Sequence, residues 1–337
     1  MRYNRQIQLD TVGVEGQQKI ADAKVLIIGV GGLGCPAAQY LVGAGVGTIG
    51  LMDHDLVSIT NLHRQVLYRE SDLGKPKAIV AKERLTDMNS EVNIIAINEA
   101  LDHENAVSIF SGYDLVIDGS DNFETKYLIN DAAILSGKPW VYGSVFKNEG
   151  QLSVFNFKDG ASYRCIFAKA TTENISCETT GVLGPVPGLL GLYQAMEALK
   201  IILDSDAVCS DRLRIFNFLN GTQQSINITK KQDQIDRILV NGIIPVQINC
   251  RLKDEERVYL DVRDQMEQPR MESNSIIHIP LNLLHSKHGE IPRETDVFVF
   301  CKTGKRSSKA IELLQTEYGF KNLHNVNGGI ETIIHGT

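Results

Sequence analysis

The sequence has few cysteines, and no two of them are close enough together to form a CxxC pair. Only six of the 337 residues are cysteines, and they are spread along the whole chain. This usage is typical of reduced intracellular thiols and excludes the framework of a small disulfide-stabilised domain. The chain also has no apolar run near the roughly 18 residues that a membrane-spanning helix needs. We therefore expect neither disulfide bonds nor a membrane span.

An excess of positive charge is also missing. The net charge is −7 at pH 7, so the chain has no general electrostatic attraction to nucleic acid. The N-terminal segment MRYNRQIQLD is charged and lacks the apolar core of a signal peptide. These observations predict a cytoplasmic protein whose partners are neither nucleic acids nor membranes.

Residues 24–53 show the pattern of a glycine-rich turn and a helix between two buried strands. The run Val25–Ile28 is apolar throughout, which predicts a parallel strand buried on both faces. A helix and a second buried strand follow, and the second strand ends on Asp53. The turn after the first strand contains four glycines: Gly29, Gly31, Gly32 and Gly34.

The spacing of these elements has a chemical reason. Glycines let the backbone approach a phosphate at the N-terminus of a helix, and Asp53 is placed to accept a hydrogen bond from a ribose hydroxyl. We interpret the stretch as a nucleotide site; the alternative is an ordinary tight turn. The motif alone does not distinguish a dinucleotide from ATP.

Charged residues beyond Asp53 favour a polyphosphate over a nicotinamide. Arg64 follows a short polar loop and Lys77 opens a predicted helix, and both can bind phosphate oxygens. Asp118 and Asp121 come at the carboxyl end of another buried strand, where open α/β sheets bind ligands. A carboxylate there can hold Mg²⁺ against phosphates. The alternatives are solvated surface cations and an aspartate that caps the next helix, residues 123–135.

Several motifs occur together in the first part of the chain. They are RYNRQIQL, GVGGLG, DHDLVSITNLHRQ, GKPK, DGSDN, EGQLSVF and GVLGPVPGLLGLYQAMEALK. With these motifs in this order and spacing, residues 1–225 resemble the MoeB/ThiF/HesA family, bacterial relatives of ubiquitin-activating enzymes. The resemblance implies a Rossmann-like domain that binds ATP with Mg²⁺ and adenylates the C-terminal glycine of a ubiquitin-like sulfur carrier, releasing pyrophosphate. It also implies a homodimer.

The resemblance assigns roles to individual residues. Gly32 is expected against the phosphates and Asp53 on the ribose. Arg64 and Lys77 are expected to neutralise the triphosphate, and Asp121 to hold Mg²⁺. The other expected contacts are Arg5 (from the other protomer of the dimer), Gly29, Gly31, Gly34, Asp55, Asn61 and Asn122.

The cysteines of this part depart from the family pattern. Many members have two CxxC pairs that hold a structural zinc, whereas this chain has only Cys165 in the first region and Cys250 in the second. A tetrahedral zinc site needs four ligands, so we predict no zinc. Cys177 falls where several members have a cysteine that links covalently to the carrier; the alternative for a lone cysteine is a small buried side chain.

Residues 151–157 alternate in polarity, which predicts that the sheet becomes antiparallel there. Residues 221–250 are weakly patterned and lead out of the first domain. After Glu256 a strand pattern starts again, and residues 258–263, 276–280 and 296–300 are predicted strands. The last of them runs into Cys301, which precedes a helix that begins among cationic residues. Backbone N–H groups and nearby cations favour the thiolate form of such a cysteine.

This second part resembles a rhodanese domain. The matching segments are LDVR, HIPL, VFVFCKTGKRS and NVNGGI, within residues 251–337. The resemblance implies that Cys301 carries sulfur as a persulfide, and that the loop amides and Arg306 hold the anionic sulfur. The stretch after Arg263 lacks the usual Gly-His-Ile, which leaves the sulfur donor open. We predict an adenylation domain at 1–240, a linker at 241–250 and a small α/β rhodanese-like domain at 251–337.

The two parts together predict one pathway. The first domain activates the carboxylate of a Gly-Gly-ending sulfur carrier as an acyl-adenylate, and the second delivers sulfur from Cys301 to give a thiocarboxylate. Thiosulfate or a cysteine desulfurase is the expected donor, and the sequence does not identify the biosynthetic pathway, for example molybdopterin or thiamine synthesis. One alternative is a ligase-like activator that forms a carrier thioester at Cys177 and does not use Cys301. A nicotinamide dehydrogenase is another, but it gives no reason for the Cys301 loop.

Overall fold

The computed structural model describes residues 2–168, 181–245, 257–265, 267, 270–271 and 273–335. The chain divides after Ile244 into two compact units, and each is considered by itself. No helix within the described ranges is both long and apolar enough to cross a membrane.

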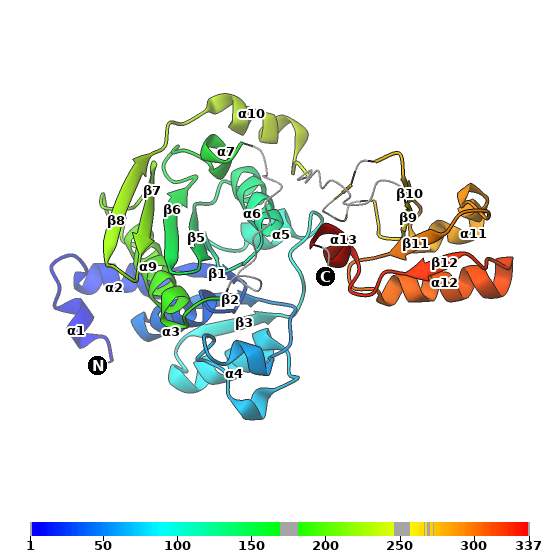
Figure 1. Cartoon of the computed structure of the whole chain (residues 1–337). Coiled ribbons are helices and arrows are strands. Elements are labelled where there is room, and N and C mark those ends of the chain that lie inside the picture. The colour runs from blue at the N-terminus through cyan, green and yellow to red at the C-terminus, as the bar shows by residue number, and fades with distance from the viewer. Residues whose placement is uncertain are drawn as a thin grey trace. The chain divides into compact units, whose positions relative to one another are not determined.

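The first unit is built on an eight-stranded sheet of order β3-β2-β1-β4-β5-β6-β7-β8 (Figure 1). Neighbouring strands from β3 to β5 are parallel, and those from β5 to β8 are antiparallel. The predicted change to antiparallel pairing after β5 is therefore confirmed. The strands are β1 (Lys24–Ile28), β2 (Thr48–Met52), β3 (Asn93–Ile97), β4 (Leu115–Asp118), β5 (Trp140–Phe146), β6 (Glu149–Phe155), β7 (Arg212–Asn217) and β8 (Thr222–Asn227).

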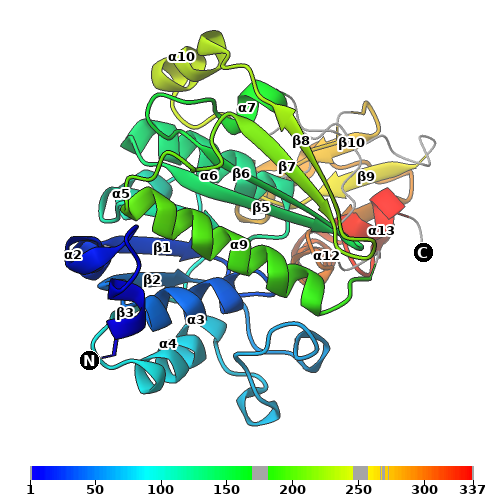
Figure 2. The same ribbon diagram turned by 90° about the vertical axis from the view of Figure 1, so that its left-hand side faces the viewer.

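Helices cover both faces of this sheet. α4, α3 and α9 pack side by side over one face, and α5 and α6 pack over the other (Figure 2). The N-terminal α1 and α2 precede the sheet, and α10 follows β8. Their bounds are α1 (Asn4–Ile7), α2 (Gly13–Asp22), α3 (Gly34–Ala44), η1 (Ile59–Asn61), η2 (Glu70–Asp72), α4 (Lys77–Met88), α5 (Ala106–Ser111), α6 (Phe123–Ser136), α7 (Tyr163–Ile166), α9 (Pro185–Ile202) and α10 (Gln232–Asn241).

Local sequence explains where these elements begin and end. The central strands are apolar and buried, as a parallel sheet covered on both faces requires. α6 begins after Asn122, whose side chain accepts the N–H of Thr125 at 2.8 Å, and it ends at Gly137, whose φ of 66° suits glycine. β8 and α10 lie in the weakly patterned residues 221–250. Every side chain of β8 is exposed, so no apolar alternation marks that strand.

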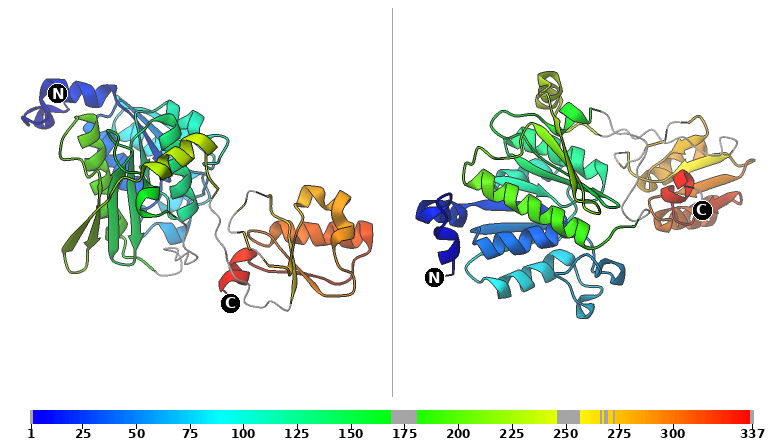
Figure 3. Two further views of the ribbon diagram at one scale, coloured as in Figure 1. Left: turned by 90° about the horizontal axis from the view of Figure 1, so that it is seen from above. Right: turned by 60° about the vertical axis from the view of Figure 1, so that its left-hand side comes forward.

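The second unit is a four-stranded parallel sheet of order β10-β9-β11-β12 with helices around it (Figure 3). The three predicted strands are present, and β12 is an addition that the sequence did not reveal. Its core is aliphatic, with Leu260, Val299 and Leu314 fully buried. The elements are β9 (Val258–Asp261), β10 (Ile276–His278), η3 (Leu281–Leu283), α11 (Leu284–Lys287), η4 (His288–Glu290), β11 (Val297–Phe300), α12 (Lys305–Tyr318), β12 (Leu323–Asn325) and α13 (Ile330–His335).

Candidate functional sites

A cavity in the first unit lies at the carboxyl ends of β1, β2 and β4. The chain leaves β1 toward β2 on one side, while β4 pairs with β1 on the other. Open α/β sheets bind ligands at such a reversal of strand order, because loops diverge there and leave a crevice. Nine of the sequence-predicted residues line this cavity: Gly29, Gly31, Gly32, Asp53, Asp55, Arg64, Lys77, Asp121 and Asn122.

The glycine turn is shaped by close backbone contacts. Gly29 has a φ of +85°, and a Cβ there would lie 2.8 Å from the carbonyl oxygen of Gly119. A Cβ on Gly34 would collide with the carbonyl of Gly29, so Gly34 serves the packing of α3 against the turn and does not line the cavity. The turn therefore requires glycine for steric reasons, and its N–H groups lie beside the first turn of α3, where a phosphate is stabilised.

Both carboxylate oxygens of Asp53 accept backbone N–H groups, one from the glycine turn and one from the loop that follows Asp53 itself. Oδ2 accepts the N–H of Val30 at 2.8 Å, and Oδ1 accepts the N–H of Asp55 at 2.9 Å. Burial raises the pKa of the Asp53 carboxyl above its ordinary value, while the positive charge of Lys77 acts in the opposite direction. Each oxygen has a second lone pair, so the carboxylate can still accept a ribose hydroxyl.

Two cations reach the cavity from different segments. Lys77 is the first residue of α4 and is only 5% exposed, and its ammonium donates to Asp55 Oδ2 at 2.9 Å. Arg64 donates from Nη1 to the carbonyl of Thr60 at 3.0 Å, and its Cδ lies close to Gly32. Asn61 holds this loop through its carbonyl oxygen, which accepts the N–H of Arg64, and it does not line the cavity.

In the loop after β4, different residues cap the next helix and face the cavity. Asn122 caps α6, whereas Asp121 is exposed and lines the cavity. Asp118 is fully buried and bonded to Lys126, so it does not offer a metal ligand. The carboxylate of Asp121 is a hard oxygen donor of the kind that Mg²⁺ prefers, and its place on the cavity wall fits a metal bound with phosphates.

Sequence reasoning assigned no role to two buried polar residues of this wall, Gln65 and Lys126. Gln65 is 4% exposed, and its Oε1 has no hydrogen-bond partner within the part of the chain that the structure describes. Lys126 is buried at the start of α6. The available signal for Lys126 was a lysine that follows a predicted buried strand closely, whereas nothing in the sequence marked Gln65 as buried.

Arg5 lies far from the cavity of its own chain. It belongs to α1, where the neighbouring Gln6 donates from Nε2 to the carbonyl of Ala44 at 3.1 Å. Ala44 ends α3 and Gly34 begins that helix beside the cavity, so the length of the 11-residue helix, about 16 Å, lies between the contact of Gln6 and the cavity, and Arg5 is not among the residues that line the cavity. That Arg5 contacts the nucleotide site of the other protomer in a dimer stays a prediction.

Cys165, in the first of the two regions where the family pattern has a CxxC pair, is held by hydrogen bonds. Cys165 is buried, and its Sγ accepts the N–H groups of Ser162 at 3.3 Å and of Lys231 at 3.2 Å. Beside it, Arg164 forms an ion pair with Asp131. Cys177 and Cys250 lie outside the described residues.

In the second unit, Cys301 sits in a cradle of hydrogen-bond donors. It is 1% exposed and follows β11. Its Sγ accepts the N–H of Gly304 at 3.1 Å and lies 3.6 Å from the hydroxyl of Ser307. Burial raises the pKa of the Cys301 thiol, but backbone N–H groups of Ser307, Thr303 and Arg306 together with the Ser307 hydroxyl lower it below its ordinary value. These donors suit a thiolate or persulfide anion.

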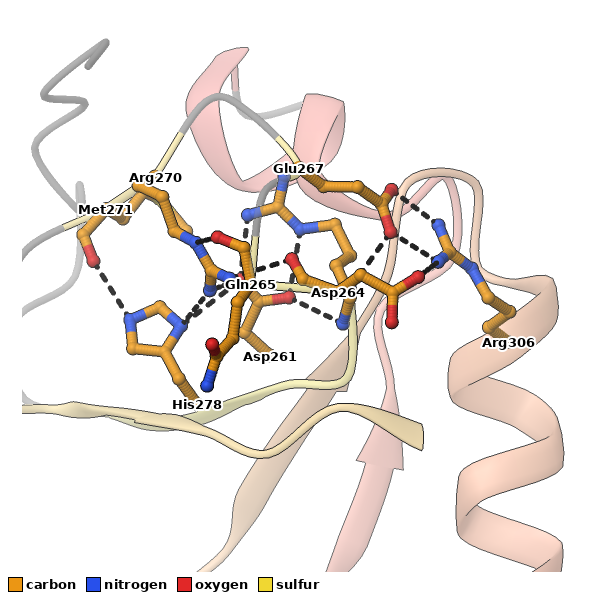
Figure 4. Close-up of polar contacts among 9 residues, drawn as sticks. Asp261, Asp264, Gln265, Glu267, Arg270, Met271, His278 and Arg306 are labelled. Atoms are coloured by element: carbon orange, nitrogen blue, oxygen red, sulfur yellow. Dashed lines mark hydrogen bonds and ion pairs between the residues drawn. The ribbon is translucent and has the colours of Figure 1, made fainter. Parts of the chain in front are cut away.

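The side chain of Arg306 is directed elsewhere. Its Nη2 donates to Glu267 Oε2 at 2.7 Å, its Nη1 bonds to Oε1 of the same carboxylate, and Asp264 lies nearby (Figure 4). This bidentate bond raises the pKa of Arg306. The structure therefore places the guanidinium on Glu267, and only the main-chain N–H of Arg306 beside the sulfur.

Several charged side chains of the second unit gather around Asp261. Asp261 ends β9 and is completely buried, and its carboxylate accepts from Arg263 at 2.7 and 2.9 Å. His278 and Arg270 approach the same carboxylate and each other (Figure 4). Burial raises the pKa of Asp261, but hydrogen bonds from His278 and Arg263 lower it overall.

Comparisons with known proteins agree with both units. Residues 3–237 match the ThiF family, and residues 246–335 match the rhodanese-like domain. Proteins named "Adenylyltransferase and sulfurtransferase MOCS3" are similar along nearly the whole chain. The one from Danio rerio is 35% identical over 98% of this chain and 84% of its own length, and the one from Dictyostelium discoideum is 31% identical over 97% and 93%.

Solved structures agree in fold. The crystal structure of E. coli MccB with ATP has a TM-score of 0.59 and 23% identity, covering 68% of this chain and 72% of that one. The predicted fold class, family resemblance and enzyme class, adenylyltransferase and sulfurtransferase, are confirmed by these matches. The chain belongs to the ThiF family and carries a rhodanese-like domain after its ThiF domain.

Proposed function

We propose that this protein adenylates the C-terminal glycine of a ubiquitin-like sulfur carrier with Mg-ATP and then supplies sulfur from a persulfide on Cys301. The observation that carries the proposal is the cavity at the reversal of strand order, where the glycine turn, the cations Lys77 and Arg64 and the exposed carboxylate of Asp121 lie on one wall. A second, separate observation is the set of N–H and O–H donors around Cys301.

The first step needs positioning and charge neutralisation rather than a general base. The carrier carboxylate is ionised at pH 7 and attacks the α-phosphorus of ATP; the bond to the β-phosphate oxygen breaks and pyrophosphate leaves. Lys77 and Arg64 bind the negative phosphate oxygens, and the turn at Gly32 lets the backbone approach them. Asp121 holds Mg²⁺, which supplies further positive charge against the phosphates.

Lys77 is well suited to this task. Among the described residues its ammonium has Asp55 as its one partner, so two of its three N–H donors are left for phosphate oxygens. Burial keeps the charge away from bulk water, where it would be screened. Asp53 accepts the ribose hydroxyl, and Gly29, Gly31, Asp55 and Asn122 shape the remaining walls, while Asn61 supports the loop that carries Arg64.

The second step transfers sulfur. A donor such as thiosulfate leaves its outer sulfur on the Cys301 thiolate and departs as sulfite, giving a persulfide. The terminal sulfur attacks the acyl carbon of the adenylate and AMP leaves, which joins the carrier to Cys301 through an acyl disulfide. A second thiol then attacks the Cys301 sulfur, forms a disulfide with it and releases the carrier thiocarboxylate. An external thiol fills that last role; alternatively, the Cys177 thiolate first attacks the carrier-bound sulfur, frees the Cys301 thiolate and holds the carrier as an acyl disulfide until the external thiol releases it.

Further parts of the proposal rest on the family resemblance. We include a homodimer in which Arg5 of one protomer serves the cavity of the other, a cytoplasmic location, and a place in molybdopterin or thiamine synthesis. Thiosulfate and a cysteine desulfurase are the candidate donors. We also keep residues 1–240, 241–250 and 251–337 as the proposed limits of the adenylation domain, linker and rhodanese-like domain.

Intact mass spectrometry of a carrier ending in Gly-Gly tests both steps. The carrier is incubated with this protein, Mg-ATP, thiosulfate and a thiol reductant, and with Cys301→Ala and Cys177→Ala variants. Cys209→Ala is the matched control, because Cys209 is fully buried and burial raises its pKa to about 11. We expect the carrier to exchange one oxygen for sulfur, and Cys301→Ala to stop this while leaving adenylation intact. A carrier whose mass never changes with ATP would contradict the first step.

A further inference from the structure

Lys126 uses its whole hydrogen-bonding capacity inside the cavity wall. Its side chain is 3% exposed. The ammonium donates to Asp118 Oδ2 at 2.7 Å, to the carbonyl of Gly143 at 2.8 Å and to the carbonyl of Ser120 at 3.0 Å. An ammonium group has three N–H donors, so none is left over for a ligand.

The three acceptors belong to three segments that border the cavity. Asp118 ends β4, Ser120 belongs to the loop after it, and Gly143 lies in β5 just before two residues of the cavity wall. Lys126 itself comes from α6. One side chain therefore joins the end of β4 and the middle of β5 to the loop between β4 and α6.

This loop is held most firmly at the residue before Asp121. Asp118 Oδ1 accepts the N–H of Ser120 at 2.9 Å and its hydroxyl at 2.5 Å, and Lys126 holds the Ser120 carbonyl. On the α9 side, Gln194 Nε2 donates to the Asp118 carbonyl at 2.6 Å. Asp121 therefore directly follows Ser120, whose backbone N–H and carbonyl oxygen are both hydrogen-bonded.

Lys77 has a different environment in the same cavity. Its one partner among the described residues is the half-exposed Asp55, so its other donors can turn to a ligand. The two lysines of this wall therefore differ in what they can do. Lys77 can bind phosphate, whereas Lys126 would first have to give up a bond to a buried carboxylate or to a strand carbonyl.

We propose that Lys126, together with Asp118, is a positioning residue that fixes the loop bearing Asp121, so that this carboxylate holds the magnesium of Mg-ATP, and that Lys126 does not itself bind phosphate. The inference rests on the proposed adenylation. It predicts that disrupting the pair weakens the contribution of Mg²⁺ to nucleotide binding and leaves metal-free nucleotide binding intact.

The choice of variant matters because the pair is buried. Lys126→Met alone leaves the Asp118 carboxylate without its counter-charge, which is strongly destabilising in a protein interior. The double variant Lys126→Met/Asp118→Asn removes both charges and keeps an oxygen that can accept from Ser120. Lys82→Met is the control, because Lys82 is an exposed lysine of α4. Thermal unfolding checks that each variant is folded.

Binding of a non-hydrolysable ATP analogue is measured by calorimetry, once with Mg²⁺ and once with a chelator. We expect Mg²⁺ to tighten binding to the parent and to Lys82→Met. In the double variant, the increase in affinity that Mg²⁺ gives should be smaller by about 10-fold or more, as is typical when a residue that orients a metal ligand is lost. The affinity for the analogue in the presence of the chelator should be unchanged. Asp121→Asn should give the same loss, and combining it with the double variant should add nothing further.

Three results would overturn the inference. Equal loss of affinity with Mg²⁺ and with chelator would mean that Lys126 binds phosphate directly. An unchanged gain from Mg²⁺ in a folded double variant would mean that the pair only stabilises the fold. A parent without any gain from Mg²⁺ would remove the role assigned to Asp121. Failure of the parent to adenylate any carrier, with this binding pattern intact, would instead count against the proposed function alone.

Discussion

Arg164 and Asp131 form a buried, two-point ion pair between α7 and α6. Arg164 Nε and Nη2 each donate to a different oxygen of Asp131 at 2.7 Å, and the side chains are 7% and 0% exposed. The pair also bonds both polar backbone groups of Ile244, the N–H to Asp131 and the carbonyl to Arg164, each at 3.0 Å. It therefore anchors the segment that follows α10 to the first unit.

Asp131→Asn should destabilise the first unit strongly. The change leaves the Arg164 cation buried without its counter-charge, and breaking a buried pair from one side costs about 3–5 kcal/mol. Urea unfolding followed by tryptophan fluorescence measures this, because Trp140 is the single tryptophan of the chain and is fully buried in β5. Asp159→Asn is the control: Asp159 pairs with Lys230 but is 92% exposed, and such surface pairs contribute little. Equal effects of both changes would contradict the anchoring role.

Removal of metal should leave the stability of this unit unchanged. The Cys165 thiol already accepts two N–H groups, and the Arg164–Asp131 pair provides the adjoining cross-link. Elemental analysis of the purified protein should find no stoichiometric zinc, and a chelator should not lower the midpoint of thermal unfolding. One equivalent of bound zinc, with an unfolding midpoint that falls when the zinc is chelated, would contradict this prediction and would indicate that Cys165, Cys177 and Cys250 are among the zinc ligands.

The sequence predicted the parts of the fold and site that depend on local pattern. The buried strands, the turn at Gly29 and the position of Asp53 follow from apolar runs and glycine spacing, which are visible along the chain. The partner of Lys126 was not visible, because Asp118 meets it only after a strand and a helix have packed. Arg306 is a similar case. Its position in the loop after Cys301 was predictable from the sequence, but the hydrogen bond from its side chain to Glu267 was not.

Cys301 should ionise at a lower pH than an ordinary thiol. Burial opposes ionisation, but the donors from Ser307 and from the backbone of the loop outweigh it and lower the pKa. A lowered pKa means that the thiolate persists to lower pH, so the ultraviolet absorbance of the thiolate should appear below the pH of a free cysteine, about 8.5. The titration is read as the difference between the parent and Cys301→Ala.

Ser307→Ala tests the cause of that shift. It removes one donor to Cys301 Sγ and should move the titration to higher pH, leaving less thiolate at neutral pH and slowing persulfide formation from thiosulfate. Ser308→Ala is the matched control, because its hydroxyl bonds the Gly304 carbonyl and not the sulfur. A titration that does not move in Ser307→Ala would mean that the backbone donors alone control the thiol.

Lys77→Met should weaken the adenylation step more than it weakens the fold. Lys77 has two donors beyond its bond to Asp55 among the described residues, and losing one donor to developing charge costs about 10²–10³-fold in kcat. Carrier-dependent pyrophosphate release measures the change, and Lys75→Met, a half-exposed neighbour bonded to Asp72, is the control. A Lys77→Met enzyme with unchanged kcat and KM for ATP would remove Lys77 from the phosphate site.

Arg306 and Glu267 should behave as one unit in sulfur transfer. The guanidinium makes two hydrogen bonds to this carboxylate. Burial raises the pKa of Glu267, but the hydrogen bond from Arg306 lowers it below its ordinary value overall. If the pair serves to hold the Cys301 loop, Arg306→Met and Glu267→Gln should slow thiosulfate-dependent persulfide formation to the same extent. The double variant should then be no slower than either single variant, because changes in one interaction are not additive. If the guanidinium instead turns to the sulfur anion during the reaction, Arg306→Met will be the slower variant by a clear margin and Glu267→Gln will stay near the parent rate. The ratio of these two rates therefore decides whether Arg306 acts on the sulfur or on the loop that surrounds it.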